Sequence, residues 1–413
     1  MADSETTPTK ESPGQTPTGH SPPLEQPPLR SVHTNTFAQV LDRLVISLAV
    51  TTYQAGKLVV LRADRREGGP VVNTHFRGFQ KPMGFAWERG RFALGTSSEI
   101  REFHDLPAVA RKLDAPEALS HHDAAFLPRI CHTTGDVQIH EMVWVPRKPG
   151  APSFSDDLSE LWFINTRFSC LATRSDPYSF VPRWRPPFIT ALAPEDRCHL
   201  NGLGLRDGQI RYLTALGETD KPCGWRDNKR SGGILMEYPS GEIITRGLSM
   251  PHSPRWHNGQ LWILESGNGG VGIVDEPTGK YREVCRLPGF TRGLDFVGRY
   301  AFIGLSQVRE SAVFSGIAIA EVPQEQRFCG VWIVDTRNAQ IVGFVKFMDA
   351  VQEIFAVQAL VGIRWPDVLN EDPKRIAETY ELPDEALLQV PPELRQPAPV
   401  TPRAPQAGPI VRQ

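Results

Sequence analysis

The segment His252–Ser266, HSPRWHNGQLWILES, decides the fold. It consists of two short strand-like runs on either side of a turn that ends at Gly259, and this pattern predicts a β-hairpin. The pattern recurs along the chain, which indicates a repeat architecture. The other five copies begin at Met83, His140, Asn201, Arg292 and Glu353.

Each copy carries a large residue four positions after its start. These anchor residues are Trp87, Trp144, Leu205, Trp256, Phe296 and Val357. A second hairpin follows, as in GGVGIVDEPTGKYREVCRL, and no helical periodicity lies between the strands. Four short strands per repeat are typical of propeller blades. We therefore predict an all-β fold, a single β-propeller of about six four-stranded blades.

The two ends of the repeat region complement each other. The copy at 353–362, EIFAVQALVG, lacks outer strands, whereas residues 44–64, LVISLAVTTYQAGKLVVLRAD, supply outer strands without a clear inner one. Together they predict one blade built from both ends of the chain. Such a blade closes the ring and removes the exposed sheet edges of an open array.

The flanking segments differ from this body in composition. Residues 1–33 are rich in Pro, Ser, Thr and Gln, and they predict a disordered tail, since they offer little apolar surface to bury. Residues 34–365 form the predicted propeller. Residues 366–413 predict a short helix followed by a Pro-rich disordered tail. Both tails could instead dock a protein partner.

Bulk properties exclude several classes of function. The formal net charge of -2 provides no basic field for nucleic acid or an anionic membrane. No secretory signal or membrane-spanning stretch is apparent, and the six Cys are scattered without a C-x-x-C pair. We expect a cytoplasmic protein with reduced thiols. No phosphate-binding loop, dinucleotide fingerprint or nucleophile elbow occurs, so we predict no organic cofactor.

The first position of each repeat predicts a ring of side chains around the central channel. Five of the six are polar, although inner-strand positions are usually apolar. The ring reads Met83, His140, Asn201, His252, Arg292 and Glu353. His199 lies two residues before Asn201 and shares its face of the strand. A solvated channel lining would explain such a ring, but a binding or catalytic site is the interpretation we favour.

The residue types suggest roles. We expect His140, His199, Asn201 and His252 to ligate a divalent metal, with Zn, Fe or Cu favoured over Ca. Glu141 or Glu353 would serve as general acid or base. Arg292 would hold a substrate carboxylate or phosphate.

Long motifs across residues 34–365 resemble a bacterial family of conserved proteins of unknown function. They include IHEMVW, DRCHLNGLGL, GLSMPHSPRWHNGQLWILESG, LPGFTRGLDF and QEIFAVQ. The resemblance implies a propeller-like β fold, and it does not indicate an activity, because none is assigned to the family. A looser likeness is to gluconolactonase-like propellers, which hold a divalent cation with Glu and Asn. Another is to peptidyl-hydroxyglycine lyases, which hold zinc with three His.

Two main functional hypotheses follow. The first is a metal-dependent hydrolase or lyase that acts on a small polar or anionic substrate, or on a modified peptide, at the channel mouth. The second is a non-catalytic module that binds a peptide or protein on its rim, through exposed residues such as Arg309 or Trp225. A structural calcium propeller without chemistry is a third, weaker option.

Overall fold

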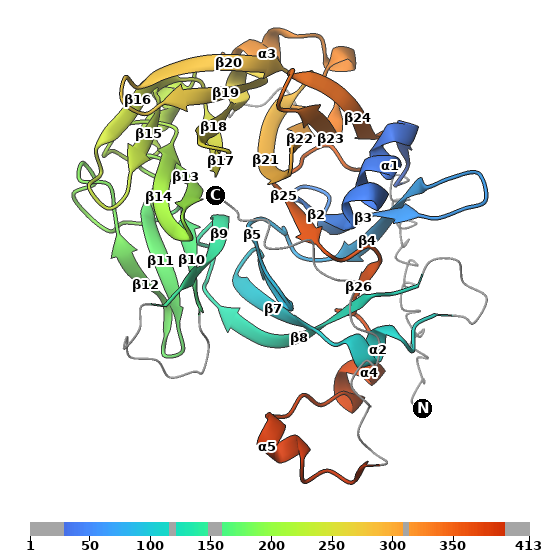
Figure 1. Cartoon of the computed structure of the whole chain (residues 1–413). Coiled ribbons are helices and arrows are strands. Elements are labelled where there is room, and N and C mark those ends of the chain that lie inside the picture. Colours follow the sequence, from blue (N-terminus) through green and yellow to red (C-terminus); the bar gives the residue numbers. More distant parts are fainter. Residues whose placement is uncertain (1–28, 115–120, 148–158, 309–313, 393–413) are drawn as a thin grey trace, which may run out of the picture.

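Six small antiparallel sheets form a ring around a central axis (Figure 1). The computed structural model describes residues 29–114, 121–147, 159–308 and 314–392. The inner strands β5, β9, β13, β17, β21 and β25 each contact the next around the axis, and β25 contacts β5. The prediction of a six-bladed β-propeller is therefore confirmed.

Three blades consist of four consecutive strands each. Their strands are β9 (Ile139–Pro146), β10 (Ser159–Asn165), β11 (Cys170–Ser175) and β12 (Tyr178–Trp184); β13 (Leu200–Arg206), β14 (Gln209–Ala215), β15 (Gly233–Glu237) and β16 (Ile243–Leu248); and β17 (Pro251–His257), β18 (Gln260–Glu265), β19 (Gly270–Asp275) and β20 (Lys280–Arg286). In each blade the first strand is innermost.

The other three blades combine strands from distant parts of the chain. One holds β5 (Phe85–Glu88), β6 (Arg91–Gly95), β7 (Glu99–Asp105), β8 (Ala124–Thr133) and β26 (Pro366–Val368); one holds β21 (Phe290–Val297), β22 (Tyr300–Ser306), β23 (Cys329–Asp335), β24 (Gln340–Phe347) and β1 (Ser31–His33); and one holds β25 (Ala356–Val361), β2 (Ile46–Thr52), β3 (Lys57–Asp64) and β4 (Val71–Gly78).

The ring is closed from both ends of the chain. β2 pairs with β25 in the register Ile46 to Val361 through Thr51 to Ala356, so the predicted shared blade is confirmed. Figure 1 shows red β25 beside blue β2. Two further strands reinforce the closure and were not predicted: β1 pairs with β24, and β26 pairs in parallel with β8.

Helices are short and peripheral. They are α1 (Asn35–Leu44), α2 (Pro107–Ala110), α3 (Ala318–Glu321), α4 (Pro373–Glu378) and α5 (Asp384–Leu387), with 3-10 turns at Gly224–Asn228, Ser266–Asn268 and Gln324–Gln326. None in the described part of the chain is long and apolar enough to cross a membrane. Residues 1–28 and 393–413, which carry most of the predicted tails, lie outside the described residues.

The core lies between the blades, where apolar faces of neighbouring sheets meet. One cluster joins Val59 and Leu61 of the shared blade to Phe302 and Val331 of the next. Around the axis the inner strands approach closely enough to require glycine. A Cβ on Gly202 would lie 2.6 Å from Pro254 Cδ of the next blade, which side chains do not tolerate. The framework around the channel is therefore tightly fixed.

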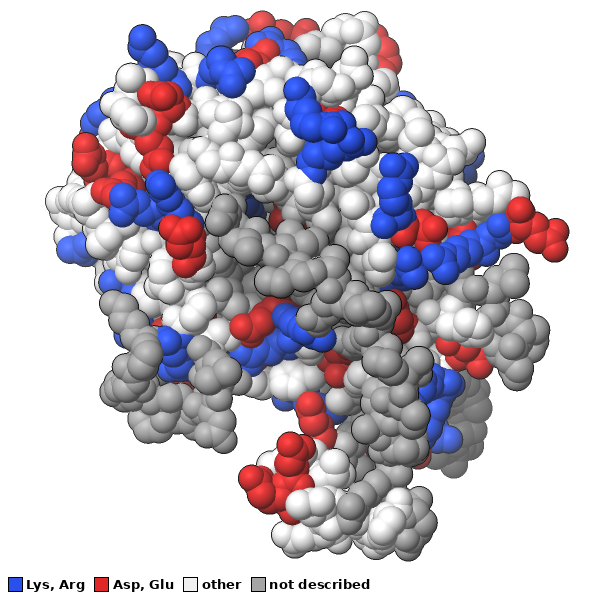
Figure 2. Space-filling model, viewed as in Figure 1, with Lys and Arg blue, Asp and Glu red and all other residues white. Residues whose placement is uncertain are grey.

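Charged side chains are mixed on the face shown in Figure 2. Lys and Arg alternate with Asp and Glu around the rim, without a large field of one sign.

Candidate functional site

The predicted ring residues lie where the inner strands begin, at one end of the channel. At this point the sheet pairing is irregular in several blades. The register shifts between Leu200 and Gly202, between His252 and Arg255, and between Thr291 and Leu294. Bulges of this kind re-aim side chains and often lie beside functional sites.

Strained backbone precedes the ring positions. Gln138, His199 and Met250 each lie two residues before a ring position and have φ values of 54°, 50° and 48°. Such left-handed conformations cost about 1–3 kcal/mol for residues other than glycine. Two of them turn their carbonyl groups toward the histidines that follow, His140 and His252.

The His140 side chain is held in one tautomer. Its Nδ1 lies 3.0 Å from the Gln138 carbonyl oxygen and 2.7 Å from Thr166 Oγ1. Because a carbonyl oxygen only accepts, Nδ1 carries the proton of the neutral ring. Thr166 Oγ1 donates its own proton to the Leu200 carbonyl oxygen at 2.6 Å, so it accepts from Nδ1. The lone pair therefore remains on Nε2, to which no described residue donates a hydrogen bond.

His252 and His199 repeat this arrangement. His252 Nδ1 lies 2.9 Å from the Met250 carbonyl oxygen and 3.0 Å from Ser266 Oγ. His199 Nδ1 lies 2.9 Å from one oxygen of Asp196 and 3.0 Å from the other. In both rings Nδ1 is the donor, and Nε2 is left without a hydrogen bond from the described residues. A carboxylate behind an imidazole fixes the orientation of the ring.

Arg292 brings a positive charge into this group of histidines. Its guanidinium carbon lies 3.5 Å from the centre of the Phe355 ring, and the His140 and Phe355 ring centres are 4.8 Å apart. The His140 and His199 ring centres are also 4.8 Å apart. Within the described residues Arg292 makes no hydrogen bond or ion pair. A guanidinium in such surroundings ordinarily has an anionic partner.

These groups influence one another electrostatically. Burial lowers the pKa of His140 well below its usual range, and His199 and Arg292 lower it further. Burial also lowers the pKa of His252 well below its usual range, and Arg292 and His199 lower it further. Burial also lowers the pKa of Arg292 to about 10, so the guanidinium stays charged at neutral pH. At pH 7 a fixed positive charge thus lies beside two neutral imidazoles. We call His140, His199, His252 and Arg292 the His/Arg cluster.

Two predicted site residues have structural roles instead. Asn201 donates from Nδ2 to the Pro251 carbonyl oxygen at 3.0 Å, and its Oδ1 accepts from Thr214 Oγ1 at 2.6 Å. Glu141 forms a two-pronged ion pair with Arg255, at 3.1 and 3.2 Å. It also accepts from Ser253 Oγ and from the Leu203 amide. Both oxygens of Glu141 are therefore occupied, which leaves it unsuited to proton transfer.

Glu353, the other predicted acid or base, lies near the cluster. Its charge raises the pKa of Arg292 against the effect of burial, but the two form no ion pair. In the described residues, no three His, Cys, Asp or Glu side chains are grouped so that they could hold a metal ion. The charge of Arg292 would also oppose a cation here. The predicted divalent metal stays a prediction without a fitting ligand set, and no step below depends on it.

Sequence reasoning did not assign a role to the residues behind the histidines. Thr166 and Ser266 both directly follow the second strand of their blades, and this shared position was the available signal. Trp225 was predicted to be an exposed rim residue, and this prediction is wrong. It is 2% exposed, donates to Asp196 and packs against His199, with the ring centres 4.5 Å apart and the ring planes tilted by 46°. Arg309 lies outside the described residues.

Comparisons with known proteins find a family match and several distant structural likenesses. A family model described as "Domain of unknown function (DUF4915)" matches residues 35–369. No curated protein matches the chain. Similar solved structures include virginiamycin B lyase from Staphylococcus aureus, at 10% identity and TM-score 0.36, covering 78% of this chain and 99% of that chain. A nidogen/laminin complex (9% identity, TM-score 0.45) and a protein of unknown function from Bacteroides caccae (8%, 0.43) each cover 77% of this chain and 99% of their own. Likenesses this distant carry no argument about activity.

Proposed function

The chain belongs to the DUF4915 family, whose domain has no assigned function, and we propose that its His/Arg cluster binds a small carboxylate- or phosphate-bearing substrate and exchanges a proton with it. The reaction class that fits is hydrolysis or elimination. The observation that carries the proposal is the closeness of two groups: a guanidinium that pairs with none of the described residues, and imidazoles whose Nε2 atoms accept no hydrogen bond from them.

Arg292 supplies the binding step. Its five N–H donors form a planar fork that matches a carboxylate or phosphate. Phe355 packs against one face of the fork, so the donors are oriented rather than free to swing. Removing the guanidinium from water strengthens its attraction for an anion, because the local dielectric is lower than that of bulk water.

The imidazoles supply the proton-transfer step. A neutral ring whose Nδ1–H is already committed can accept a proton only at Nε2. His140 and His252 are kept neutral at physiological pH by the causes described above. In elimination the ring takes a proton from a substrate carbon, the C–H electron pair forms a double bond, and the leaving group departs from the neighbouring carbon with its bonding pair. In hydrolysis the ring takes a proton from water, the water oxygen bonds to the ester carbon or phosphorus, and the alcohol leaves and takes up a proton. The bound anion then stabilises the imidazolium that forms, because it offsets the charge of Arg292.

The binding step is tested by isothermal titration calorimetry with inorganic phosphate and with acetate. We expect saturable binding by the native protein and at least tenfold weaker binding by Arg292→Met. Arg286→Met is the matched control, because Arg286 lies exposed on the outer strand β20. Equal binding by the native protein and Arg292→Met would overturn the proposal.

The proton-transfer step is tested separately with the chromogenic esters p-nitrophenyl acetate and p-nitrophenyl phosphate. If the reaction is hydrolysis, His140→Gln should lower turnover of the accepted ester at least tenfold while anion binding persists. A variant that loses neither turnover nor binding would remove His140 from the mechanism.

A further inference from the structure

A second cavity lies along the opposite half of the channel, where the inner strands end. Its volume is about 440 Å³, within the usual range for small-molecule sites. All six repeat anchors line it, one from each blade. They are Trp87, Trp144, Leu205, Trp256, Phe296 and Val357. The same repeat that places polar residues at one end of the channel therefore places large apolar residues at the other.

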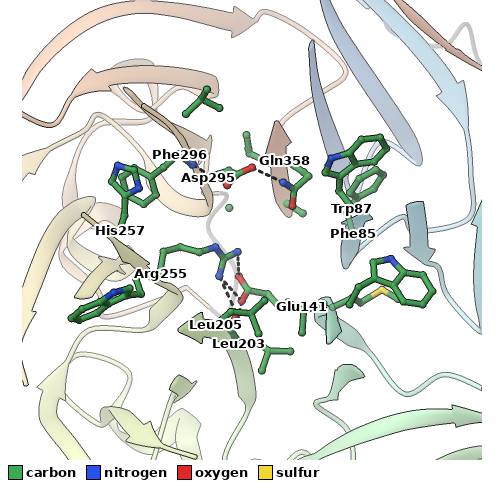
Figure 3. A pocket seen from close by; sticks show the side chains of 18 of the residues that line it. Phe85, Trp87, Glu141, Leu203, Leu205, Arg255, His257, Asp295, Phe296 and Gln358 are labelled. Carbon is green, nitrogen blue, oxygen red and sulfur yellow. Dashed lines mark hydrogen bonds and ion pairs between the residues drawn. The ribbon is translucent and has the colours of Figure 1, made fainter. Parts of the chain in front are cut away.

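An ion pair borders this cavity. Glu141 and Arg255 both line it, and both oxygens of Glu141 and all three guanidinium nitrogens of Arg255 make hydrogen bonds within the protein. Figure 3 shows the pair on one side, with Asp295 and Gln358 facing it. His140 is the member of the His/Arg cluster that also reaches this lining. The ion pair of Glu141 and Arg255 thus lies between the apolar walls of the cavity and the His/Arg cluster.

The walls are aromatic and held in place. Figure 3 shows Trp87 on one side and Phe296 with His257 on the other. The His257 and Phe296 rings are stacked with centres 4.2 Å apart. The guanidinium of Arg206 lies 3.9 Å from the centre of the Trp256 ring, and its charge is taken up by Glu276 at 2.9 Å. Pre-positioned rings of this kind favour flat ligands, since little ordering entropy is lost on binding.

The charges that line the cavity are mostly negative. Glu141 pairs with Arg255, and the exposed Asp207 has Arg206 at 4.0 Å. Asp295 makes no ion pair with a described residue, and its carboxylate accepts hydrogen bonds from Gln358 and from two backbone amides. Burial lowers the pKa of His257, so its ring adds no positive charge at neutral pH.

One polar atom in the lining is available to a ligand. The Gln358 amide donates from Nε2 to Asp295 at 2.5 Å, which points its Oε1 elsewhere. Among the described residues nothing donates to that Oε1. An N–H or O–H group on a ligand can therefore pair with it.

We propose that this cavity is a second ligand site, distinct from the His/Arg cluster, for a flat aromatic molecule that is neutral or cationic and carries a hydrogen-bond donor. The six anchor residues supply the apolar contact, and Gln358 receives the donor. The charge preference is opposite to that of the cluster, so the two ends of one channel select different chemical classes.

Two fluorescent probes with the same aromatic skeleton test the proposal. N-phenyl-1-naphthylamine is neutral and has one N–H donor, and 1-anilinonaphthalene-8-sulfonate adds a sulfonate to it. We expect the neutral probe to bind the native protein at a single saturable site. We expect the sulfonate to bind that site at least tenfold more weakly. Equal or tighter binding of the sulfonate would contradict the charge argument.

Variants locate the probe. Leu205→Trp introduces the side chain that three other blades carry at the same position, so the backbone can accept it. We expect it to weaken binding of the neutral probe at least tenfold. Ile341→Trp, at a residue of β24 that is 48% exposed, is the matched control. Arg292→Met should leave the neutral probe unaffected. If Leu205→Trp and Trp87→Ala both leave binding unchanged, or if Arg292→Met abolishes it, the second site is refuted.

Discussion

Removing His140 and His252 from water makes their protonation unfavourable, and Arg292 adds electrostatic repulsion to that cost. The unfolded chain has no such restriction, and its histidines titrate near pH 6.5. The folded protein therefore holds these two rings neutral in a range where the unfolded chain takes up protons. This difference couples the site to the stability of the whole molecule.

The expected result is a loss of stability on mild acidification. Below about pH 6.5 the unfolded state binds more protons, so the free energy of unfolding falls as pH falls, by up to about 1.4 kcal/mol per pH unit for each histidine. Urea unfolding at several pH values between 7.5 and 5.5 measures this change in the free energy of unfolding. The double variant His140→Gln/His252→Gln should show a shallower pH dependence. An unchanged slope would mean that these rings are protonated in the folded state.

The ion pair of Glu141 with Arg255 gives a second prediction at the residue scale. Glu141→Gln leaves the Arg255 charge without its partner, and we expect a loss of about 3 kcal/mol in the free energy of unfolding. The double variant Glu141→Gln/Arg255→Met should lose less than the sum of the single variants. Glu283→Gln, which breaks an exposed ion pair with Arg286, is the control and should cost less than about 1 kcal/mol. Additive losses would contradict the structural role of Glu141.

At the scale of the strand, the shared repeat position explains why the site was partly predictable. A fixed spacing within each hairpin put the ring positions and the anchors on the channel side, and His140, His252 and Arg292 do gather there. The bulges at the strand starts and the left-handed residues before them have no clear sequence signal. Sequence alone therefore could not show that Asn201 and Glu141 turn into the framework.

The short strand β26 is held in place partly by hydrogen bonds to a charged side chain. β26 pairs with β8 in one blade, while its Asp367 accepts from His75 and Arg77 on β4 of the neighbouring blade. Burial raises the pKa of Asp367, but these two hydrogen bonds outweigh it and hold the pKa well below its ordinary value. β26 thus bridges two blades.

Asp367→Asn should loosen this bridge. Hydrogen bonds to a charged group contribute about 1.5–3 kcal/mol each, so we expect a local loss of about 2 kcal/mol. Hydrogen exchange of the amides in residues 366–369 should become faster, and exchange in β17 should stay slow. Asp207→Asn, at a side chain that is 79% exposed, is the control. Unchanged exchange in residues 366–369 would show that strand pairing alone holds β26.

For the molecule as a whole, closure was visible in the sequence because each terminal repeat lacked what the other supplied. The complementary fragments at residues 44–64 and 353–362 identified the shared blade. The reinforcing strands β1 and β26 are each three residues long, too short for periodicity to distinguish from loop. Their pairing depends on contacts between distant parts of the chain, and these contacts appear only in the folded ring.

A closed ring should unfold as one unit. Leu48 is fully buried in the shared blade and belongs to a core cluster that extends into the next blade. Leu48→Ala should therefore lower the free energy of unfolding by about 2–5 kcal/mol. Trp fluorescence and far-ultraviolet circular dichroism should report the same urea midpoint. Leu382→Ala, at a residue 42% exposed, should change little. Separate midpoints for the two probes would contradict closure as the source of cooperativity.

The most direct test of the functional account is a long-range ¹H–¹⁵N NMR measurement of the histidine rings as pH is lowered, with signals assigned from single His→Gln variants. The account predicts that His140 and His252 carry their proton on Nδ1 and remain neutral at pH 6.5. Added inorganic phosphate should raise the pKa of both rings, because it offsets the charge of Arg292. Protonated rings at pH 6.5, or protons on Nε2, would contradict the proposed site.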